Sequence, residues 1–322
     1  MKKINFLFYT ITIFIFTIFL FIFSTKINST ILFSFNLWKE NIFPSLFPFF
    51  VVSSILINIG FVDFISNILK NIFYKLFLSN KYSTFIFFMS MLSGFPSSGK
   101  YLKDLLDKKK IDINEANKIL LFTFFSNPLF IINTIGISFY NSRKIGFIIL
   151  ISHYLGNIIV GILFRKYNYK EDRSKKIDFK KEINYFNNQI NNTNIITVLL
   201  SSIIDSMKSL INIFATITFF LIILTIITNI FNLSEPYNSI FSGLIEMTSG
   251  LKYLNTTNLS LNLKIIISGF FVSFGGLSIH GQILSILKDY DIKYLKFFII
   301  RIIHGLISSL IIFMVLRMDV LF

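Results

Sequence analysis

Residues 88–101 read FMSMLSGFPSSGKY, a stretch in which two glycines and a proline end an apolar run. The segment Gly94–Lys100 matches the first seven positions of the phosphate-binding pattern G-x-x-x-x-G-K-[ST]. The eighth position is Tyr101, so the Ser or Thr that would bind Mg²⁺ is absent. The flanking sequence also lacks the βαβ pattern of a nucleotide-binding domain. We therefore interpret the stretch as an interrupted helix inside a membrane, with a purely structural kink as the alternative.

The composition places the chain in the membrane class. Of its 322 residues, 54% are hydrophobic and only 15% are charged, and the mean hydropathy is +0.70. A soluble chain of this length has about a quarter of its residues charged. Several apolar runs of about 18 residues or more are long enough to cross a bilayer. The net charge of +15 lies largely in short loops, a distribution typical of the positive-inside rule rather than of nucleic-acid binding.

The chain divides at a polar, basic and Asn-rich stretch that we interpret as a linker. At the N-terminus, two lysines precede an apolar run without a small-residue cleavage pattern, so we predict an uncleaved transmembrane helix. The predicted parts are a transmembrane helix at 1–34, a first membrane repeat at 35–165, the linker at 166–194 and a second membrane repeat at 195–322.

Three further interruptions occur in apolar segments. Pro44 and Pro48 remove two backbone donors four residues apart and predict a kinked or locally opened helix. Ser126-Asn127-Pro128 and Phe274–Ser278 interrupt two longer apolar runs. An unpaired backbone amide or carbonyl in hydrocarbon costs several kcal/mol, so such breaks occur where protein, water or a solute satisfies the freed groups. The breaks therefore predict a solute site inside the membrane.

The two halves align at an offset of 181 residues, which sets Gly94–Ser97 against Gly275–Ser278. If residues 83–99 are re-entrant, the lysine-rich loop 100–118 lies inside, and its equivalent 288–296, which has fewer lysines, lies outside. This asymmetry has the sign of an inverted repeat. The predicted fold class is therefore all-α, a polytopic membrane protein with two inverted-topology repeats that contain broken or re-entrant helices. Within the second repeat, we expect an amphipathic helix at 195–210 and then a separate span.

Residues at the breaks are the candidates for solute binding, because helix starts direct partial positive charge toward an anion. Lys100 and His280 lie at the ends of two breaks and are candidate partners for an anionic group. The alternatives are a lysine that reaches the headgroups and a histidine that caps a helix. The candidate substrate-binding residues are Ser93, Gly94, Pro96, Ser97, Gly99, Lys100, Asn127, Gly275, Gly276, Ser278, His280 and Gln282.

Ionisable residues within spans are functional candidates by default. Glu246 is the candidate site for a coupling proton or cation, or for an ion pair with a basic partner. Arg301 and His304 lie three apart on one helix face, and an ion pair with Glu246 is weighed equally with a ligand role. For His153 we expect a hydrogen-bonded packing role. The candidate coupling or ion-pair residues are Glu246, Thr248, Ser249, Arg301 and His304.

The sequence offers no arrangement typical of an enzyme. It contains no Ser/His/Asp set, no paired catalytic carboxylates and no H-E-x-x-H motif. The absence of cysteine excludes disulfides and thiolate metal sites. We expect no enzymatic activity, no cofactor, no metal and no nucleic-acid partner. The expected partners are a small anionic solute and membrane lipid, and a homo-oligomer is an open alternative.

Five motifs occur in an order that resembles a known family. They are Trp38 with FPSLFPF at 43–49, SGFP at 93–96 with Lys100, NPLFI at 127–131, GLIEMTSG at 243–250 and FGGLSIHGQ at 274–282. Together they resemble the sporulation integral membrane proteins of the YlbJ (SpoVV) type, from Trp38 to the last span. The resemblance implies a nucleoside-recognition, gate-type membrane domain distantly akin to concentrative nucleoside transporters.

The resemblance also implies a function. It implies transport of dipicolinic acid, a flat pyridine dicarboxylate, across the outer forespore membrane during endospore formation. We therefore expect a multi-pass transporter in that membrane that works by alternating access around the two glycine breaks. The alternatives are a transporter of another solute, such as a nucleoside, and a non-transporting membrane scaffold for spore-envelope assembly.

Overall fold

The fold consists of helices that are apolar and repeatedly interrupted. The computed structural model describes residues 2–169 and 194–318, and within these ranges it contains no strand. The first part comprises α1 (Lys2–Ile22), α2 (Ser24–Leu37), η1 (Trp38–Ile42), α3 (Phe43–Asn58), α4 (Phe61–Phe77), α5 (Tyr82–Ser93), α6 (Ser97–Asp107), α7 (Ile113–Leu120), η2 (Phe130–Phe139) and α8 (Arg143–Leu163). The second part comprises α10 (Ile195–Phe231), α11 (Tyr237–Ile245), α12 (Met247–Thr256), α13 (Leu261–Phe274), α14 (Gly276–Ile286) and α15 (Tyr294–Arg317).

Four of these units are long and apolar enough to cross a membrane, which confirms a polytopic helical protein. They are α8, α10, the nearly continuous pair α13 and α14, and α15. Two bent pairs, α1 with α2 and α3 with α4, turn by 90° and 87° and raise the number of candidate spans to six. Most of the predicted linker at 166–194 lies outside the described residues.

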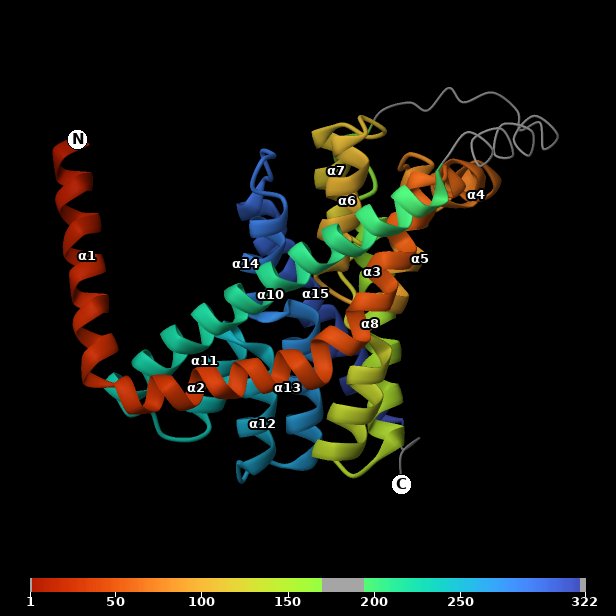
Figure 1. The fold of residues 1–322 in the computed structure, drawn as a ribbon. Coiled ribbons are helices and arrows are strands. Elements are labelled where there is room, and N and C mark those ends of the chain that lie inside the picture. The colour runs from red at the N-terminus through yellow and green to blue at the C-terminus, as the bar shows by residue number, and fades with distance from the viewer. Residues whose placement is uncertain (1, 170–193, 319–322) are drawn as a thin grey trace.

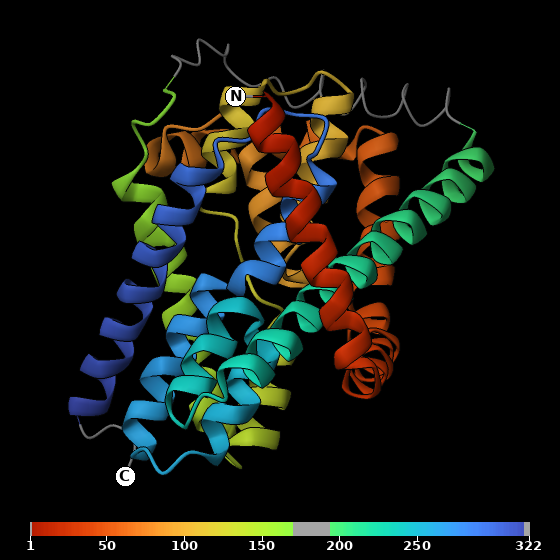
Figure 2. The same ribbon diagram turned by 90° about the vertical axis from the view of Figure 1, so that its left-hand side faces the viewer.

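The long helix α10 crosses the body obliquely, as Figures 1 and 2 show. It packs against α2, α3 and α14, whereas α1 stands apart and meets α10 through the Phe16 and Phe219 rings at 5.9 Å. The expected division of this region at residue 210 is wrong, because α10 continues unbroken for 37 residues. The apolar residues Leu210 and Ile213 at that point are buried and continue the same packed face.

The proline pair opens the backbone where α2 meets α3. η1 is a π-helical turn that ends directly before α3, with Pro44 in the first turn of that helix and Pro48 inside it. Pro44 has no N–H to donate to the residue 40 carbonyl, so an ordinary α-helical ladder cannot continue through this point. The predicted local opening is therefore confirmed, and it lies mainly before Pro44.

Two hairpins and two interrupted passages form the centre of the body. α5 packs against α6 with Gly94–Pro96 at the tip, and α11 packs against α12 with Glu246 at the tip. α7 leads through the non-helical residues 123–127 into η2, and α13 leads through Gly275 into α14. The predicted interruptions at 94–96 and 274–278 are confirmed. The one predicted at 126–128 is longer than expected and lies mostly before Ser126.

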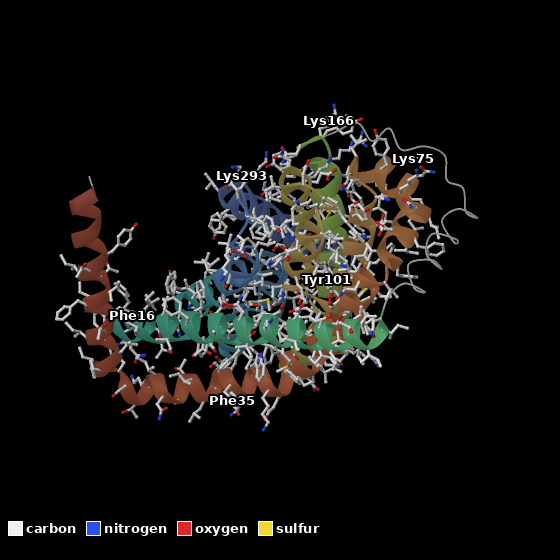
Figure 3. All side chains as sticks on the ribbon, turned by 45° about the horizontal axis from the view of Figure 1, so that its top comes forward. Phe16, Phe35, Lys75, Tyr101, Lys166 and Lys293 are labelled. Carbon is white, nitrogen blue, oxygen red and sulfur yellow. The ribbon has the colours of Figure 1, made fainter. Side chains whose placement is uncertain are left out.

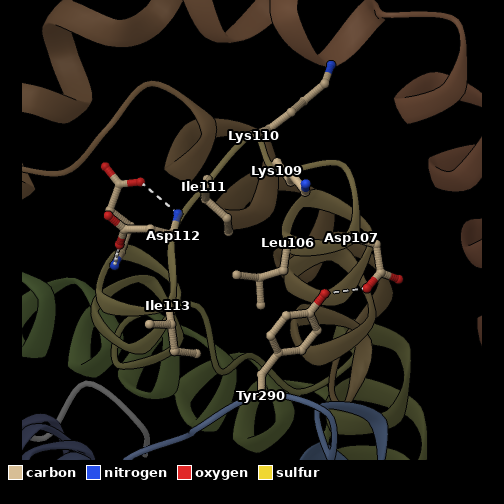
Figure 4. A pocket seen from close by; sticks show the side chains of 9 residues that line it. Leu106, Asp107, Lys109, Lys110, Ile111, Asp112, Ile113 and Tyr290 are labelled. Carbon is tan, nitrogen blue, oxygen red and sulfur yellow. Dashed lines mark hydrogen bonds between the residues drawn. The ribbon is translucent and has the colours of Figure 1, made fainter.

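The loops after α6 and after α14 lie on the same side of the molecule (Figures 1 and 4). Tyr290 donates a hydrogen bond to Asp107, and Lys293 N donates to Asn117 Oδ1 over 2.8 Å. The bond to Asp107 raises the pKa of Tyr290 to about 12, so its phenol stays protonated and able to donate at neutral pH. Figure 3 shows Lys293 near the same end of the body as Lys75 and Lys166.

This arrangement corrects the predicted alignment of the two halves. An inverted relation between Gly94–Ser97 and Gly275–Ser278 requires the loops that follow them to lie on opposite sides. They lie together because α13 and α14 form one nearly straight unit, whereas α5 and α6 fold back as a hairpin. The expectation that loop 288–296 lies opposite loop 100–118 is therefore wrong.

Candidate functional site

The first hairpin tip rests on Asn127. α5 ends at Ser93, and Gly94 has φ 82° and ψ 173°, a conformation that is essentially restricted to glycine. A Cβ atom at Gly94 would lie 2.7 Å from Asn127 Cα. Asn127 Nδ2 donates to Ser93 O over 3.1 Å, so the amide satisfies a carbonyl that the end of α5 leaves free. The glycine therefore permits a close contact between two interrupted segments.

Asn127 also caps the helical segment that follows it. Its Oδ1 accepts hydrogen bonds from Leu129 N over 2.8 Å and from Phe130 N over 3.3 Å. The first amides of a helix have no partner within the helix, and an asparagine before the first turn is a preferred acceptor. One side chain thus satisfies both sides of the interruption.

Glu246 performs the same task at the second hairpin tip. It ends α11, and its carboxylate accepts from Thr248 N over 3.1 Å and from Ser249 N over 2.7 Å at the start of α12. Negative charge at a helix start is stabilised by the helix dipole. Gly276 has φ 70°, and a Cβ atom there would lie 3.1 Å from Met247 N, so the break in the α13–α14 passage packs against this tip.

The two tips and the two passages meet at a cavity of about 410 Å³. Its apolar wall comes from η1, α3, α10 and the residues that flank the breaks, including Phe95 and Met247. Its charged residues are Glu40 and Glu246. Among the described residues, no Lys, Arg or His lines it. The uncharged polar residues in the wall are Ser126, Asn127, Asn133, Thr134, Thr248 and Gln282.

A second polar group lies behind this wall and supports the non-helical segment of the first passage. Arg301 Nη2 donates to Leu121 O, and Asn157 Nδ2 donates to Phe124 O. His153 Nε2 accepts from Ser126 N over 2.9 Å. All three side chains are fully buried, and they come from α8 and α15. They supply the hydrogen bonds that a helix would otherwise make, which is how an extended backbone persists in an apolar body.

The hydrogen bonds fix the tautomers of two histidines in this group. Because His153 Nε2 accepts from an amide, its proton is on Nδ1 and points to Ser273 Oγ at 2.9 Å. His304 Nε2 lies 2.9 Å from the carbonyl of His153 and must donate, so its Nδ1 accepts from Arg301 Nη1 at 3.1 Å. Both imidazoles are therefore neutral, and Arg301 is the single cation of the group. We name Arg301, His304, His153 and Asn157 the arginine cluster.

Arg301 has no acidic partner among the described residues. Its guanidinium contacts Asn157, His304 and Leu121 O, and it lies over the rings of Phe124 and Phe297 at 4.8 and 5.4 Å. The aromatic faces partly compensate the buried charge through cation–π attraction. Glu246 instead binds the amides of α12, so the structure assigns the two charges to different sites rather than to one ion pair.

The structure separates the predicted site residues into two sets. Five of them line the cavity: Pro96, Asn127, Glu246, Thr248 and Gln282. Of the others, Gly94 and Gly276 shape the breaks, and Ser249 donates its amide to Glu246. Those elsewhere in the packed body are Ser93, Ser97, Gly99, Lys100, Gly275, Ser278, His280, Arg301 and His304.

The two predicted cationic partners of an anion both have other partners. Lys100 is 2% exposed, and its Nζ forms an ion pair with Asp104 Oδ2 at 2.9 Å. His280 Nε2 lies 2.9 Å from Phe274 O and donates to it, which satisfies a carbonyl freed where α13 ends. The contacts of His280 therefore agree with the alternative prediction, in which this histidine caps a helix end.

Four polar or charged wall residues were not singled out as solute ligands from the sequence. Glu40 lies between the interfacial Trp38 and the proline pair. An acidic residue between two apolar runs is a signal that could have identified this position. Ser126 belongs to the predicted break, whereas Asn133 and Thr134 lie within an apolar run and give no signal. Within the described residues, no three His, Asp or Glu side chains come together as a metal site.

The chain is similar to a curated protein along most of its length. It is 29% identical over 300 residues to the sporulation integral membrane protein YlbJ of Bacillus subtilis (strain 168). The alignment covers 85% of this chain and 74% of that relative. The chain is therefore similar to a sporulation integral membrane protein of the YlbJ type. No protein-family model and no solved structure matches it. This similarity to an integral membrane protein, together with four to six apolar helical units long enough to cross a bilayer, supports a multi-pass integral membrane protein.

Proposed function

We propose that this protein is a membrane transporter that carries a small solute through the 410 Å³ cavity by alternating access. The observation that carries the proposal is the convergence of interrupted segments from distant parts of the chain, Phe95-Pro96, Ser126-Asn127 and Glu246–Thr248, on one cavity. Interruptions of this kind in apolar helices are typical of transporter sites. The cavity volume lies within the range of about 300–1,000 Å³ that ligand sites occupy.

We further propose that the two halves are inverted repeats, related by a different correspondence from the one that the sequence alignment predicts. The hairpin α5–α6 then corresponds to α11–α12, the passage from α7 to η2 corresponds to α13–α14, and α8 corresponds to α15. Two parallel contacts support this relation. The first tip packs on the break of the first passage at Asn127, and the second tip packs on the break of the second passage at Gly276. This arrangement is the basis for proposing a fold akin to concentrative nucleoside transporters.

Dipicolinate, carried across the outer forespore membrane during endospore formation, is the first solute that we propose. The support is the resemblance to the YlbJ type and the sporulation role in the relative's name. The walls also include Phe95 and Phe130, which suit a flat ring. Two like unit charges about 6 Å apart repel by about 3 kcal/mol at an effective dielectric constant of about 20. A dianion near Glu246 therefore needs its charge offset by protons or a cation.

A nucleoside is the second candidate, favoured by the uncharged polar groups of the wall. Asn127, Asn133 and Gln282 carry amides, and Thr134 and Thr248 carry hydroxyls. Such groups suit the hydroxyls and base edge of an uncharged solute. An uncharged solute also needs no cationic partner, and the described part of the wall contains no Lys, Arg or His.

Uptake by purified protein in liposomes tests the proposal. Labelled dipicolinate and labelled uridine are compared, with empty liposomes as the blank. We expect saturable uptake of dipicolinate, and about a fivefold or larger rise in KM when Gln282→Leu removes a wall hydrogen-bonding group. Thr228→Val on α10, outside the wall, is the control with unchanged KM. Uptake of uridine alone would overturn the proposed solute, and uptake of neither would favour the scaffold alternative.

A further inference from the structure

An apolar groove of about 680 Å³ lies where the end of α8 meets the start of α15. Its floor consists of Phe164, which directly follows α8, and of isoleucines on the first turns of α15, among them Ile299 and Ile303. It shares no lining residue with the 410 Å³ cavity. Both helices are candidate spans, and a span ends where hydrocarbon meets the headgroups. The groove therefore lies at that boundary of the bilayer.

The floor of the groove has a packed inner side and an apolar outer side. Ile300 belongs to a small buried cluster, against which Phe164 and Tyr167 pack. On the outer side, Leu295 is 72% exposed and Ile299 is 48% exposed. Exposed apolar side chains at the end of a span contact acyl chains rather than water. The groove thus offers a fixed apolar surface that an acyl chain can cover.

The headgroup side of the groove is basic. Lys293 and Lys296 line it, and the exposed Arg165 directly follows Phe164 in the chain. Among the described residues, no Asp or Glu lines the groove. Lys293 Nζ forms an ion pair with Asp291, but both side chains are more than half exposed. Such exposed pairs are weak, so this lysine can exchange its partner for another anion.

Lys296 is held by an aromatic ring rather than by an acid. Its Nζ lies 3.6 Å from the centroid of the Tyr167 ring. It has no acidic partner in the part of the chain that the structure describes. The ring attracts the ammonium group but carries no net charge, so it positions the cation without neutralising it. The charge of Lys296 is therefore left for an anion at the groove.

The position of the groove decides which anion fits. Lys293 lies at the same end of the body as Lys75 and Lys166 (Figure 3), and the lysine-rich loop 100–118 lies on this side as well. By the positive-inside rule this end faces the cytoplasmic leaflet, which carries anionic lipid. A free phosphate would contact only the basic side and would leave the apolar floor uncovered. A phospholipid covers both.

We propose that this groove binds an anionic phospholipid, with its phosphate at Lys293 and Lys296 and an acyl chain along the isoleucines of α15. The site lies outside the cavity, and the proposal does not depend on the transport function. The bound lipid connects the ends of α8 and α15, the two helices that carry the arginine cluster. Because it binds the folded chain, the lipid stabilises that chain against unfolding.

Native mass spectrometry of the delipidated full chain in detergent measures this binding. Phosphatidylglycerol and phosphatidylcholine with identical oleoyl chains are titrated separately. We expect one phosphatidylglycerol to bind with about a fivefold or greater preference, and Lys296→Gln to weaken its binding about fivefold. Lys288→Gln removes the same charge from an exposed position at the same end but outside the groove. Since salt screens charges beyond about 8 Å, this control should change the affinity less than about twofold.

A second variant tests the apolar floor at constant charge. Ile299→Trp places a larger side chain in the groove and should weaken phosphatidylglycerol binding about fivefold. If this variant melts below the natural protein without lipid, the more exposed Leu295→Trp takes its place. Phosphatidylglycerol should also raise the apparent melting temperature of the natural protein more than that of Lys296→Gln.

Five results would overturn the proposal. Equal binding of the two lipids, or equal effects of Lys296→Gln and Lys288→Gln, would mean that the basic side selects no headgroup. An unchanged affinity in the folded tryptophan variant would exclude the floor from the site. Displacement of the lipid by glycerol 3-phosphate would assign the lysines to a soluble phosphate. A protein dimer that the tryptophan variant dissociates would assign the groove to a second copy of the chain.

Discussion

The cavity wall and the arginine cluster are both polar regions inside an apolar body, but their polar atoms have different partners. In the arginine cluster, Arg301, Asn157 and His153 bond to backbone atoms of residues 121, 124 and 126. On the cavity side, Glu246 and Asn127 accept hydrogen bonds from the amides of the helices that follow them, and both residues also line the cavity.

The comparison separates two uses of an intramembrane polar residue. Ionisable residues in spans are functional candidates by default. Yet Arg301, the only fully buried arginine of the described residues, donates a hydrogen bond to a backbone carbonyl. It holds the non-helical segment whose last residues, Ser126 and Asn127, face the cavity. The arginine cluster therefore supports the backbone beside the cavity, and the wall is where we propose that the solute binds. Variants that act on stability or on solute affinity alone test this division.

The largest effect is expected for Arg301→Met. The change leaves Leu121 O, the Asn157 amide oxygen and His304 Nδ1 without their donor inside the body. Each buried group without a partner costs about 1–3 kcal/mol, so the free energy of unfolding should fall by roughly 3 kcal/mol or more. The measurement is the apparent melting temperature of the purified protein in detergent.

Arg317→Met is the matched control for this prediction. Arg317 is exposed at the end of the same helix, so its loss should leave the melting temperature nearly unchanged. If the two variants were equally stable but only Arg301→Met lost solute uptake, Arg301 would be a ligand, and the division between cluster and wall would fail.

A smaller effect is expected at the first hairpin tip, where two glycines of one segment differ in what surrounds them. Gly94→Ala places a Cβ atom 2.7 Å from Asn127 Cα at φ 82°, and such backbone strain costs about 1–3 kcal/mol before the clash is counted. At Gly99 the nearest atom would be Ile283 Cα at 3.6 Å. Gly99→Ala should be neutral or stabilise α6 by up to about 1 kcal/mol. Equal melting temperatures for the two variants would contradict the tight contact of this tip with Asn127.

The sequence allowed the breaks and part of the wall to be predicted, because their residues act locally. Glycine and proline interrupt helices by their own geometry, and Asn127 and Glu246 cap the turns that directly follow them. The non-helical segment 121–125 could not be predicted, because its LFTFF sequence is apolar and its path depends on Arg301, Asn157 and His153 from distant helices.

The partners of the basic residues could not be predicted for the same reason. His280 directly follows a break, where either a solute or the end of α13 can accept its proton, and only the folded chain shows Phe274 O in that position. The alignment matched Gly94 with Gly275 because both are glycines at breaks. It failed because Gly94 lies at a hairpin tip, whereas Gly275 lies inside a nearly straight passage.

The smallest effect is expected for the double variant Lys100→Gln, Asp104→Asn. It removes the charge of the buried ion pair but keeps hydrogen-bonding groups at both positions, so neither partner is left as an unpaired buried charge. Since Lys100 does not line the cavity, the KM for solute uptake should change by less than about twofold. The measurement is initial uptake across a range of solute concentrations, beside Gln282→Leu as the wall variant. A rise in KM for dipicolinate as large as that of Gln282→Leu, with no such rise for uridine, would show that Lys100 attracts the anion. The cavity wall would then not account for solute charge by itself, and the comparison with the arginine cluster would have to include the ion pair of α6.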